Sequence, residues 1–279
     1  PRSPGEATAG DATGMSEDDL LDRARADASL ALGRAEVEVV TIERAQDAQA
    51  ASDLLNQVWQ MPAGVDVMEL STLVALAHSG NYVAIARSRT AVHEVLAASV
   101  GFFGPPGQPL HSHITGVTGS AVGRGIGRAM KLHQRAWVLE RGASQITWTF
   151  DPLVARNAFF NLTTIGARAV AYFPDHYGPM IDGLNEGQGS DRMLMRWDLG
   201  AGPTPAPAQA SMPVGPLGGA DVRHIDIPAD IEAIRRTDPA TAIRWRTETR
   251  AAFTALLGEG WRVLGIERPA RYVLTKEPR

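Results

Sequence analysis

The sequence contains no cysteine, and only two of its 27 basic residues are lysine, Lys131 and Lys276. The absence of cysteine excludes disulfides, thiolate zinc sites, iron–sulfur clusters and a cysteine nucleophile. The chain also lacks an apolar run of about 18 uncharged residues, which is the length that a membrane span needs. We therefore expect a soluble protein without thiol chemistry.

An excess of positive charge is missing as well. The 31 acidic and 27 basic side chains give a formal net charge of −4 and a pI near 6.0. Nucleic acids and anionic membranes are attracted mainly by positive fields. The charge therefore predicts no nucleic-acid partner and no membrane partner.

The composition is that of a globular protein, with 44% hydrophobic residues. A length of 279 residues is enough for one large domain with a smaller companion domain. Residues 1–14 contain two prolines, three glycines and no large aliphatic or aromatic side chain, so we predict a disordered leader. The leader lacks the basic start and apolar stretch of a secretory signal, which favours a cytoplasmic location.

Periodic patterns begin after the leader. In segment 15–36, Ser16 and Asp19 form a capping-box pattern, and alanine and leucine then recur at helical spacing, which predicts a helix over 17–32. Segment 37–199 alternates short apolar runs with helical stretches, which predicts a mixed α/β (α+β) domain. We expect strands at 37–42, 82–87, 97–103, 110–118, 145–150, 167–173 and 192–198, and helices at 45–58, 67–78, 125–141 and 154–165.

The C-terminal part is separated by composition. Residues 200–219 are rich in proline and glycine and predict a linker. Residues 220–279 then predict a small βαβ-type subdomain, with Asp238 and Pro239 starting a helix. That helix contains Arg244, Arg246 and Arg250, which fit either a phosphate-binding patch or, as we favour, an amphipathic helix docked on the main domain.

The most informative motif is the glycine-rich stretch Val122-Gly-Arg-Gly-Ile-Gly127, which lies between a predicted strand and a predicted helix. Such a turn presents free backbone N–H groups and the positive end of a helix dipole, and so suits a phosphate or pyrophosphate. The third glycine of a dinucleotide-binding fingerprint and the Gly-Lys-Ser/Thr of a Walker A loop are both absent. A plain strand-to-helix connection is the alternative interpretation.

In its glycine turn and the strand–helix–strand that follows, the stretch 37–199 resembles the GNAT superfamily of acyl-coenzyme A-dependent N-acetyltransferases. The family motif, Gln/Arg-x-x-Gly-x-Gly/Ala, is matched at Gly125 and Gly127 and departs at Val122. The runs Ile146–Leu153, Arg156-Asn-Ala158, Tyr177-Gly and Asp191-Arg resemble an uncharacterised branch with a C-terminal extension. The resemblance implies a GNAT fold and an enzyme that transfers an acetyl group from acetyl-CoA, its co-substrate.

The resemblance also implies how the donor is bound. A bulge at Gly116, where sequence alone suggests a bulge or a close backbone approach, would splay strand 110–118 from strand 145–150, and pantetheine would pair with the exposed edge. Its partners would be the backbone of Val117 and Thr118 and the helix residues Asn157 and Asn161. The pyrophosphate would lie on the glycine turn, formed by Val122, Gly123, Arg124, Gly125, Ile126 and Gly127.

The proton-transferring residues are less certain from sequence. Alternation along the strand places residues 111, 113 and 115 on the face of Val117, and His111 lies where histone-type family members carry a catalytic glutamate. With an ordinary pKa near 6.5 this imidazole suits a general base. Leu162 occupies the position of the usual tyrosine acid, so we name Tyr177 as its replacement. The alternatives are core histidines and a surface or core tyrosine.

The acceptor is expected to be a small amine. The segment 151–191 contains five acidic residues against Arg156 and Arg168, and Asp151 follows strand 145–150 directly. Such an excess would attract a cation, so Asp151 is our candidate acceptor-binding carboxylate, although it also fits a helix N-cap followed by Pro152. We predict no metal site, because His111 and His113 have no third ligand at a recognisable spacing.

Two functions remain open at this level. The first is an N-acetyltransferase acting on a small-molecule amine, with a homodimer as an open alternative to a monomer. The second is a non-catalytic acyl-CoA sensor or interaction module of the same fold, which Leu162 at the tyrosine position favours.

Overall fold

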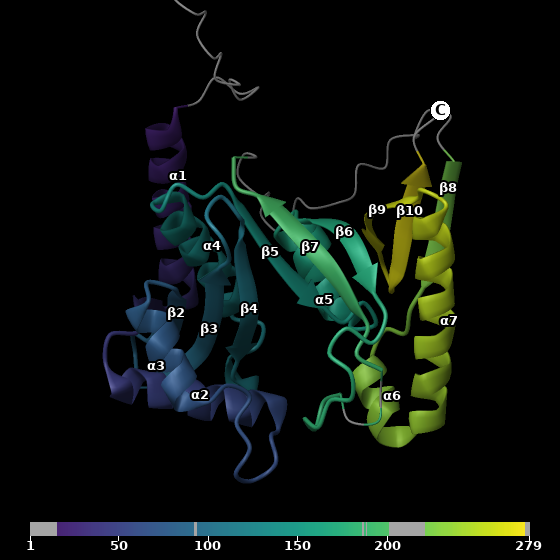
Figure 1. The fold of residues 1–279 in the computed structure, drawn as a ribbon, viewed down its shortest axis with the longest axis horizontal. Coiled ribbons are helices and arrows are strands. Elements are labelled where there is room, and N and C mark those ends of the chain that lie inside the picture. Colours follow the sequence, from purple (N-terminus) through teal and green to yellow (C-terminus); the bar gives the residue numbers. More distant parts are fainter. Residues whose placement is uncertain (1–15, 92–93, 186, 188, 201–220, 277–279) are drawn as a thin grey trace, which may run out of the picture.

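The structure is a computed structural model that describes residues 16–91, 94–185, 187, 189–200 and 221–276 (Figure 1). The predicted leader 1–14 and nearly all of the predicted linker 200–219 lie outside these residues. The helices are α1 (Glu17–Ala35), α2 (Ala45–Trp59), α3 (Leu70–His78), α4 (Ile126–Leu139), α5 (Ala155–Phe159), α6 (Ile231–Thr237) and α7 (Pro239–Gly258), with a 3-10 turn at Gly119–Ala121 and a π-helical turn at Phe160–Thr164.

The strands form two sheets. They are β1 (Val37–Thr41), β2 (Tyr82–Ser88), β3 (Val95–Phe103), β4 (Leu110–Val117), β5 (Gln145–Phe150), β6 (Arg168–Phe173), β7 (Arg192–Asp198), β8 (Asp221–Asp226), β9 (Arg262–Glu267) and β10 (Arg271–Lys276). The larger sheet has the order β1-β2-β3-β4-β5-β7-β6, and only the β4–β5 pair is parallel. The predicted mixed α/β class is confirmed.

Helices cover both faces of the larger sheet (Figure 1). One core cluster joins α1 and α4 to one face, where Met130 and Ile146 are buried. A second cluster joins α2 and α3 to the opposite face, where Leu55 and Ile114 are buried. Apolar residues recur at helical spacing in α1 and α4 because each helix buries one stripe against the sheet.

Several boundaries differ from the prediction. Ser16 caps α1 as expected, but the helix continues to Ala35 and ends on Glu36 in the left-handed conformation. The predicted helix 154–165 begins at Ala155 and becomes a π-helical turn at Phe160. Asp151 is not its N-cap, because that position is Val154. The short helix α6 was not predicted.

The C-terminal subdomain has the predicted βαβ order, because β8 leads through α6 and α7 to β9. Its three strands lie in the order β8-β10-β9, and both pairs are antiparallel, so β8 and β9 run parallel to each other with β10 between them. The predicted cap is confirmed, since the Asp238 side chain accepts the N–H of Thr241 and Pro239 is the first helical residue of α7. Helix α7 docks on the main domain as we favoured: Phe253 is fully buried and stacks on Tyr172 of β6. Among the described residues, no helix is both long and apolar enough to cross a bilayer.

Candidate functional site

The centre of the larger sheet opens between β4 and β5. Their ladder contains only the pairs Leu110–Ile146 and His111–Thr147, at the start of both strands. Beyond these pairs the two strands separate, as Figure 1 shows. The rest of β4 is hydrogen-bonded to β3 on one side and presents an open edge towards β5 on the other.

The bulge that accompanies this opening lies at His113 rather than at Gly116. The β3–β4 register passes from Val100–Ile114 to Gly101–Ser112, so His113 is the additional residue on β4. Gly116 pairs regularly with Ala98, and the predicted bulge there is wrong. A glycine is needed at this position because a Cβ would lie 2.8 Å from the Trp59 ring.

The bulge also changes which side chains share a face. Ser112 faces α4, where its Oγ accepts a hydrogen bond from Lys131 (2.8 Å), whereas Ile114 packs in the α2 cluster. Val117 packs against the α4 cluster again. His111 and Val117 therefore lie on opposite faces, and our prediction from unbroken alternation is wrong.

The open edge of β4 offers one of the two predicted backbone partners. The N–H of Thr118 donates to the carbonyl of Leu96 on β3 (2.9 Å), so it is not free for a ligand, contrary to the prediction. Because backbone groups point alternately to the two sides of an antiparallel strand, Val117 directs its N–H and C=O towards β5. Val117 can therefore pair with an extended ligand.

The glycine turn has the geometry of an anion site. Gly123 and Gly125 have φ of 86° and 81°, in the left-handed region that favours glycine. Gly125 is the N-cap of α4, and no side chain caps this end of the helix. The first-turn N–H groups, beginning at Ile126, therefore point outward with the positive end of the helix dipole. Val122, Gly123, Arg124 and Gly125 are exposed, Ile126 is buried, and Gly127 is half-buried.

The two asparagines after β5 are not equivalent. Asn161 is buried, and its Oδ1 accepts the indole N–H of Trp148 on β5 (3.1 Å). The π-helical turn draws Asn161 towards that tryptophan, so its carbonyl oxygen is not free for pantetheine, contrary to the prediction. Asn157 is half-buried, and Leu162, at the expected tyrosine position, packs on the core.

His111 lies where β4 and β5 begin to diverge. Its ring contacts those of Phe102 and His113, at centroid distances of 5.4 and 5.9 Å. Burial lowers the pKa of His111 to about 4, and the nearby positive charges of His113, Lys131 and His176 add to this effect. The ordinary histidine pKa assumed from sequence is therefore wrong, although the imidazole remains neutral and able to accept a proton near pH 7.

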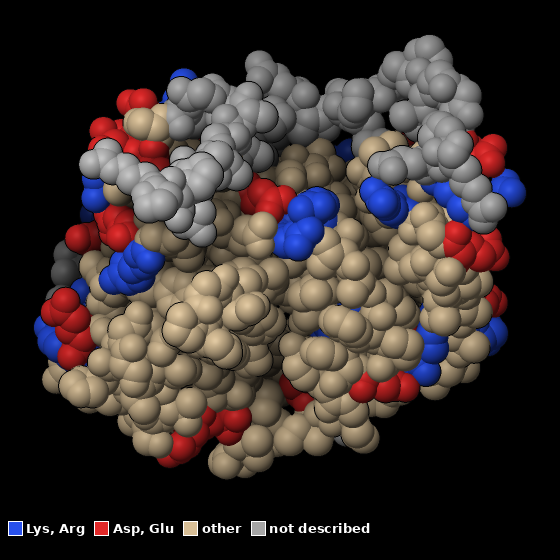
Figure 2. Space-filling view, turned by 45° about the horizontal axis from the view of Figure 1, so that its top comes forward, with Lys and Arg blue, Asp and Glu red and all other residues tan. Residues whose placement is uncertain are grey.

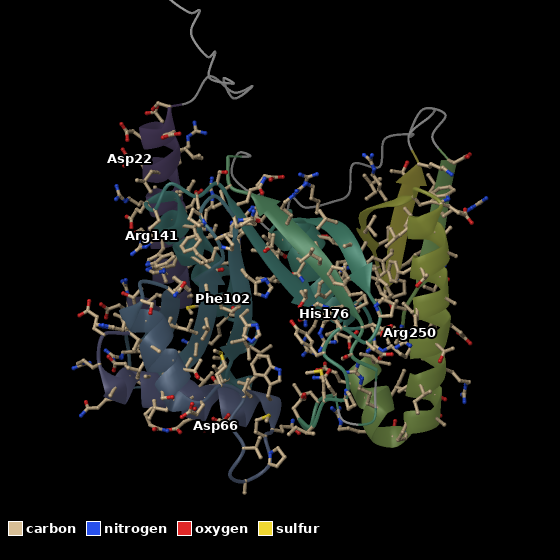
Figure 3. The ribbon with its side chains drawn as sticks, in the orientation of Figure 1. Asp22, Asp66, Phe102, Arg141, His176 and Arg250 are labelled. Atoms are coloured by element: carbon tan, nitrogen blue, oxygen red, sulfur yellow. The ribbon has the colours of Figure 1, made fainter. Side chains whose placement is uncertain are left out.

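Tyr177 comes from the turn after β6 and lies on the same face of the sheet as His111. Its hydroxyl is hydrogen-bonded to Oγ1 of Thr149 on β5 (2.9 Å), and its side chain is 42% exposed. Thr149 follows Thr147, the β5 partner of His111, by two residues and therefore shares its face. His176 contacts Tyr177 edge to face, and Figure 3 shows Phe102 and His176 on either side of the opening.

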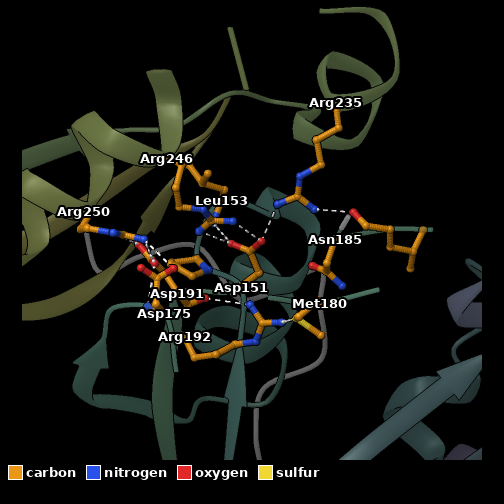
Figure 4. A network of polar contacts seen from close by, with 12 residues as sticks. Asp151, Leu153, Asp175, Met180, Asn185, Asp191, Arg192, Arg235, Arg246 and Arg250 are labelled. Atoms are coloured by element: carbon orange, nitrogen blue, oxygen red, sulfur yellow. Dashed lines mark hydrogen bonds and ion pairs between the residues drawn. The ribbon is translucent and has the colours of Figure 1, made fainter. Parts of the chain in front are cut away.

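Asp151 is not an acceptor-binding carboxylate. It is buried, and it forms ion pairs with Arg235 (2.5 Å) and Arg246 (2.6 Å) of the C-terminal subdomain (Figure 4). Burial alone would raise the pKa of Asp151, but Arg246 and Arg235 outweigh that effect and lower it to about 2. The predicted acceptor-binding role of Asp151 is wrong, because both of its carboxylate oxygens already bind guanidinium groups.

The same correction applies to the acidic segment as a whole. Arg250 of α7 binds Asp191 (2.5 Å) and Asp175 (2.9 Å), while Asp182 accepts hydrogen bonds from its own turn. We call the ion pairs of Arg235, Arg246 and Arg250 with Asp151, Asp175 and Asp191 the C-terminal seam. These acidic groups hold the two domains together and do not form a cation-attracting surface.

Lys131 is a buried residue that the sequence analysis overlooked. It projects from α4, and its Nζ donates to Ser112 Oγ (2.8 Å) and Gln134 Oε1 (3.2 Å) and lies 4.2 Å from the centroid of the Trp148 ring. Burial lowers the pKa of Lys131 to about 7. The sequence did contain a signal for this residue. Lys131 is one of two lysines in an arginine-rich chain, and it lies within the buried stripe of a helix.

The described residues contain no group of three or more His, Cys, Asp or Glu side chains placed to hold a metal ion. On the face in Figure 2, basic and acidic side chains are interspersed around a largely uncharged middle, without a continuous basic patch.

Known structures are similar to part of this chain in fold. No family model matches the sequence, and no curated protein matches it. The fold is similar to that of the ribosomal-protein-S18-alanine N-acetyltransferase from Escherichia coli, with a TM-score of 0.46 and 12% identity over 60% of this chain and 96% of that one. It is also similar to a putative acetyltransferase from Salmonella typhimurium, solved with acetyl-CoA (TM-score 0.47, 14% identity, 61% and 98% coverage).

A putative acetyltransferase of the GNAT family from Desulfovibrio desulfuricans has a TM-score of 0.44 and 13% identity over 58% of this chain and 99% of that one. The site described above depends on this chain's own geometry.

Proposed function

We propose that this protein is an N-acyltransferase that moves an acetyl group directly from acetyl-CoA to a small amine. The observation that carries the proposal is the open β4 edge combined with the uncapped glycine turn at the start of α4. An extended chain can pair with the edge while an anion binds the turn. Both features lie at one end of the same strand, which suits a ligand with a pyrophosphate and a linear amide-containing arm.

The residues present fit that donor. The backbone N–H groups of Gly123 and of Gly125 to Gly127 would bind the pyrophosphate, whereas the N–H of Arg124 already donates to the Ala121 carbonyl (3.3 Å). A Cβ built on Gly123 or Gly125 meets no atom within 4 Å, so the turn is unobstructed. Val117 would pair with the pantetheine amides. Acetyl-CoA supplies an activated thioester, and the chain supplies the alignment of that thioester with the amine.

Proton transfer falls to residues on the His111 face. The attacking amine must lose a proton as its nitrogen bonds to the acyl carbon, and neutral His111 would accept that proton, directly or through water. The bond from the acyl carbon to sulfur breaks in the same exchange, and the Tyr177 hydroxyl is our candidate donor to the departing thiolate. His111 and Tyr177 are surrounded by the rings of Phe102, His113 and His176, by Thr149 and by the guanidinium of Arg192, so the amine need not be a polycation.

A second candidate function is supported by the α5 region. Leu162 replaces the expected tyrosine, and Asn161 is bonded to Trp148. These two features favour an acyl-CoA sensor, which would bind the donor without turning it over.

Two measurements test these proposals. A thermal-shift titration should show stabilisation by acetyl-CoA but not by acetate or free adenine nucleoside, because a ligand that binds the folded state raises its stability. Release of free thiol should then depend on an amine from a panel of aromatic, aliphatic, amino-sugar and polyamine acceptors. Binding without release over a broad panel of amines and acyl donors supports the sensor, and absence of binding contradicts both functions.

A further inference from the structure

The turn at residues 174–177 carries both His176 and Tyr177 and is held from the start of β7. The N–H of His176 donates to the Ser190 carbonyl (3.1 Å), and the N–H of Tyr177 donates to Ser190 Oγ (3.0 Å). The N–H of Asp175 donates to Asp191 Oδ1 (3.0 Å). The position of the turn therefore depends on Ser190 and Asp191.

Asp191 is in turn held by α7. Its carboxylate is fully buried, accepts the hydroxyl of Tyr172, and receives Nε (3.0 Å) and Nη2 (2.5 Å) of Arg250. Nη2 of the same guanidinium also reaches Asp175 Oδ1 (2.9 Å), within the turn itself (Figure 4). A planar guanidinium that binds two carboxylates fixes their relative position better than an ammonium can.

The backbone at Gly189 lies so close to this contact that it leaves no space for a side chain of its own. A Cβ at Gly189 would lie 2.7 Å from Nη2 of Arg250 and 2.8 Å from Oδ1 of Asp175. Any side chain at position 189 would therefore push the guanidinium away from the turn. The packing of Gly189 is an observation independent of the ion pairs, and it points to the same contact.

We propose that Arg250 is a positioning residue, through which the C-terminal subdomain holds His176 and Tyr177 at the acceptor side of the β4–β5 opening. The kinetic consequence of this inference rests on the proposed function, whereas the contact between Arg250 and the turn does not depend on it. The glycine turn and Val117 make none of these contacts. Changes in the C-terminal subdomain should therefore alter the reaction of the amine and leave the binding of the donor unchanged.

The test compares Arg250→Ala with Arg244→Ala, since Arg244 is exposed on the same helix and, within the part of the chain that the structure describes, donates to Thr241 one turn away. Hydrogen exchange in peptides covering the 174–177 turn should accelerate about tenfold in Arg250→Ala, with no change in peptides covering the glycine turn. With an amine substrate, kcat/KM should fall about tenfold or more, because small misplacements are costly, while the Kd of acetyl-CoA stays unchanged. Arg250→Lys should recover part of both effects, and Arg244→Ala should match the wild type.

Gly189→Ala provides a second route that leaves every charge in place. It should reproduce the exchange and kinetic changes of Arg250→Ala if the guanidinium is displaced. Unchanged exchange in the turn of both folded variants would overturn the inference, and so would faster exchange with unchanged amine kinetics. If the wild type transfers no acyl group to any amine, the proposed function fails, whereas the exchange comparison still decides whether α7 holds the turn.

Discussion

The β4–β5 opening and the C-terminal seam are neighbouring regions with opposite chemistry. The opening is formed by backbone edges, glycines, histidines and aromatic rings, and its groups are left without strong partners. The seam is formed by carboxylates and guanidinium groups paired with each other, and Asp151, Asp191 and Arg246 among them are buried. The difference shows that Asp151, Asp175 and Asp191 bind the two domains to each other, and that few formal charges line the opening.

Removing Asp151 should have the largest effect and would break the seam. Asp151→Ala leaves Arg235 and Arg246 buried without their shared counter-ion, so we expect a loss of about 3–5 kcal/mol in the free energy of unfolding. Denaturant unfolding measures this value. Asp22→Ala is the control, because its side chain is 80% exposed and lies 3.6 Å from Arg25, and should cost under about 1 kcal/mol. Similar losses in the two variants would remove the distinction between seam and surface.

The sequence reveals these two regions to different degrees. The glycine turn was predictable because helix starts and positive-φ glycines leave a local signature in consecutive residues. The strands 145–150 and 192–198 were predicted to the residue, because buried apolar alternation marks them clearly. The seam was not predictable, since the partners of Asp151 lie 84 and 95 residues away in the chain.

The bulge in β4 is a second feature that could not be predicted from the sequence. An extra residue at His113 leaves no mark in the apolar pattern, yet it reverses every later side chain of β4. The alternation argument therefore placed His111 on the wrong face relative to Val117. Asn161 was misassigned for a similar reason, because a π-helical turn shifts the helical register without a local sequence signal.

The pH dependence of kcat/KM tests the role of His111 in the opening. If His111 is the base, kcat/KM should fall on the acid side near pH 4, not 6.5, because its pKa is lowered to about 4. His111→Gln should reduce kcat/KM about 100-fold, the lower end for a general base, because a weakened base contributes less. His224→Gln, on the exposed face of β8, should leave the profile unchanged. An acid limb near 6.5 that persists in His111→Gln would assign the base elsewhere.

A smaller effect is expected at the glycine turn. Gly125 has φ of 81°, where alanine is strained by about 1–2 kcal/mol, so Gly125→Ala should distort the turn and weaken acetyl-CoA binding about tenfold. Isothermal titration calorimetry measures the Kd. Gly142→Ala is a matched control, because Gly142 has φ of 71° and follows the other end of α4. The control should lose comparable stability and keep its affinity, and equal losses of affinity would show that the turn is not the donor site.

Lys131 gives the smallest and most specific effect, because it is a buried cation that has no place in the seam. Its pKa falls from 10.5 to about 7 on folding, so between these values the unfolded chain binds more protons than the native one. The free energy of unfolding should therefore rise with pH over this range, by about 1 kcal/mol from pH 7 to pH 8 for this group alone. Unfolding curves of Lys131→Met should lack that increment, whereas Lys276→Met, which changes the other lysine of the chain, should retain it. An unchanged pH slope in Lys131→Met would mean that the buried amine stays protonated, and that a positive charge lies beside the Trp148 ring of β5.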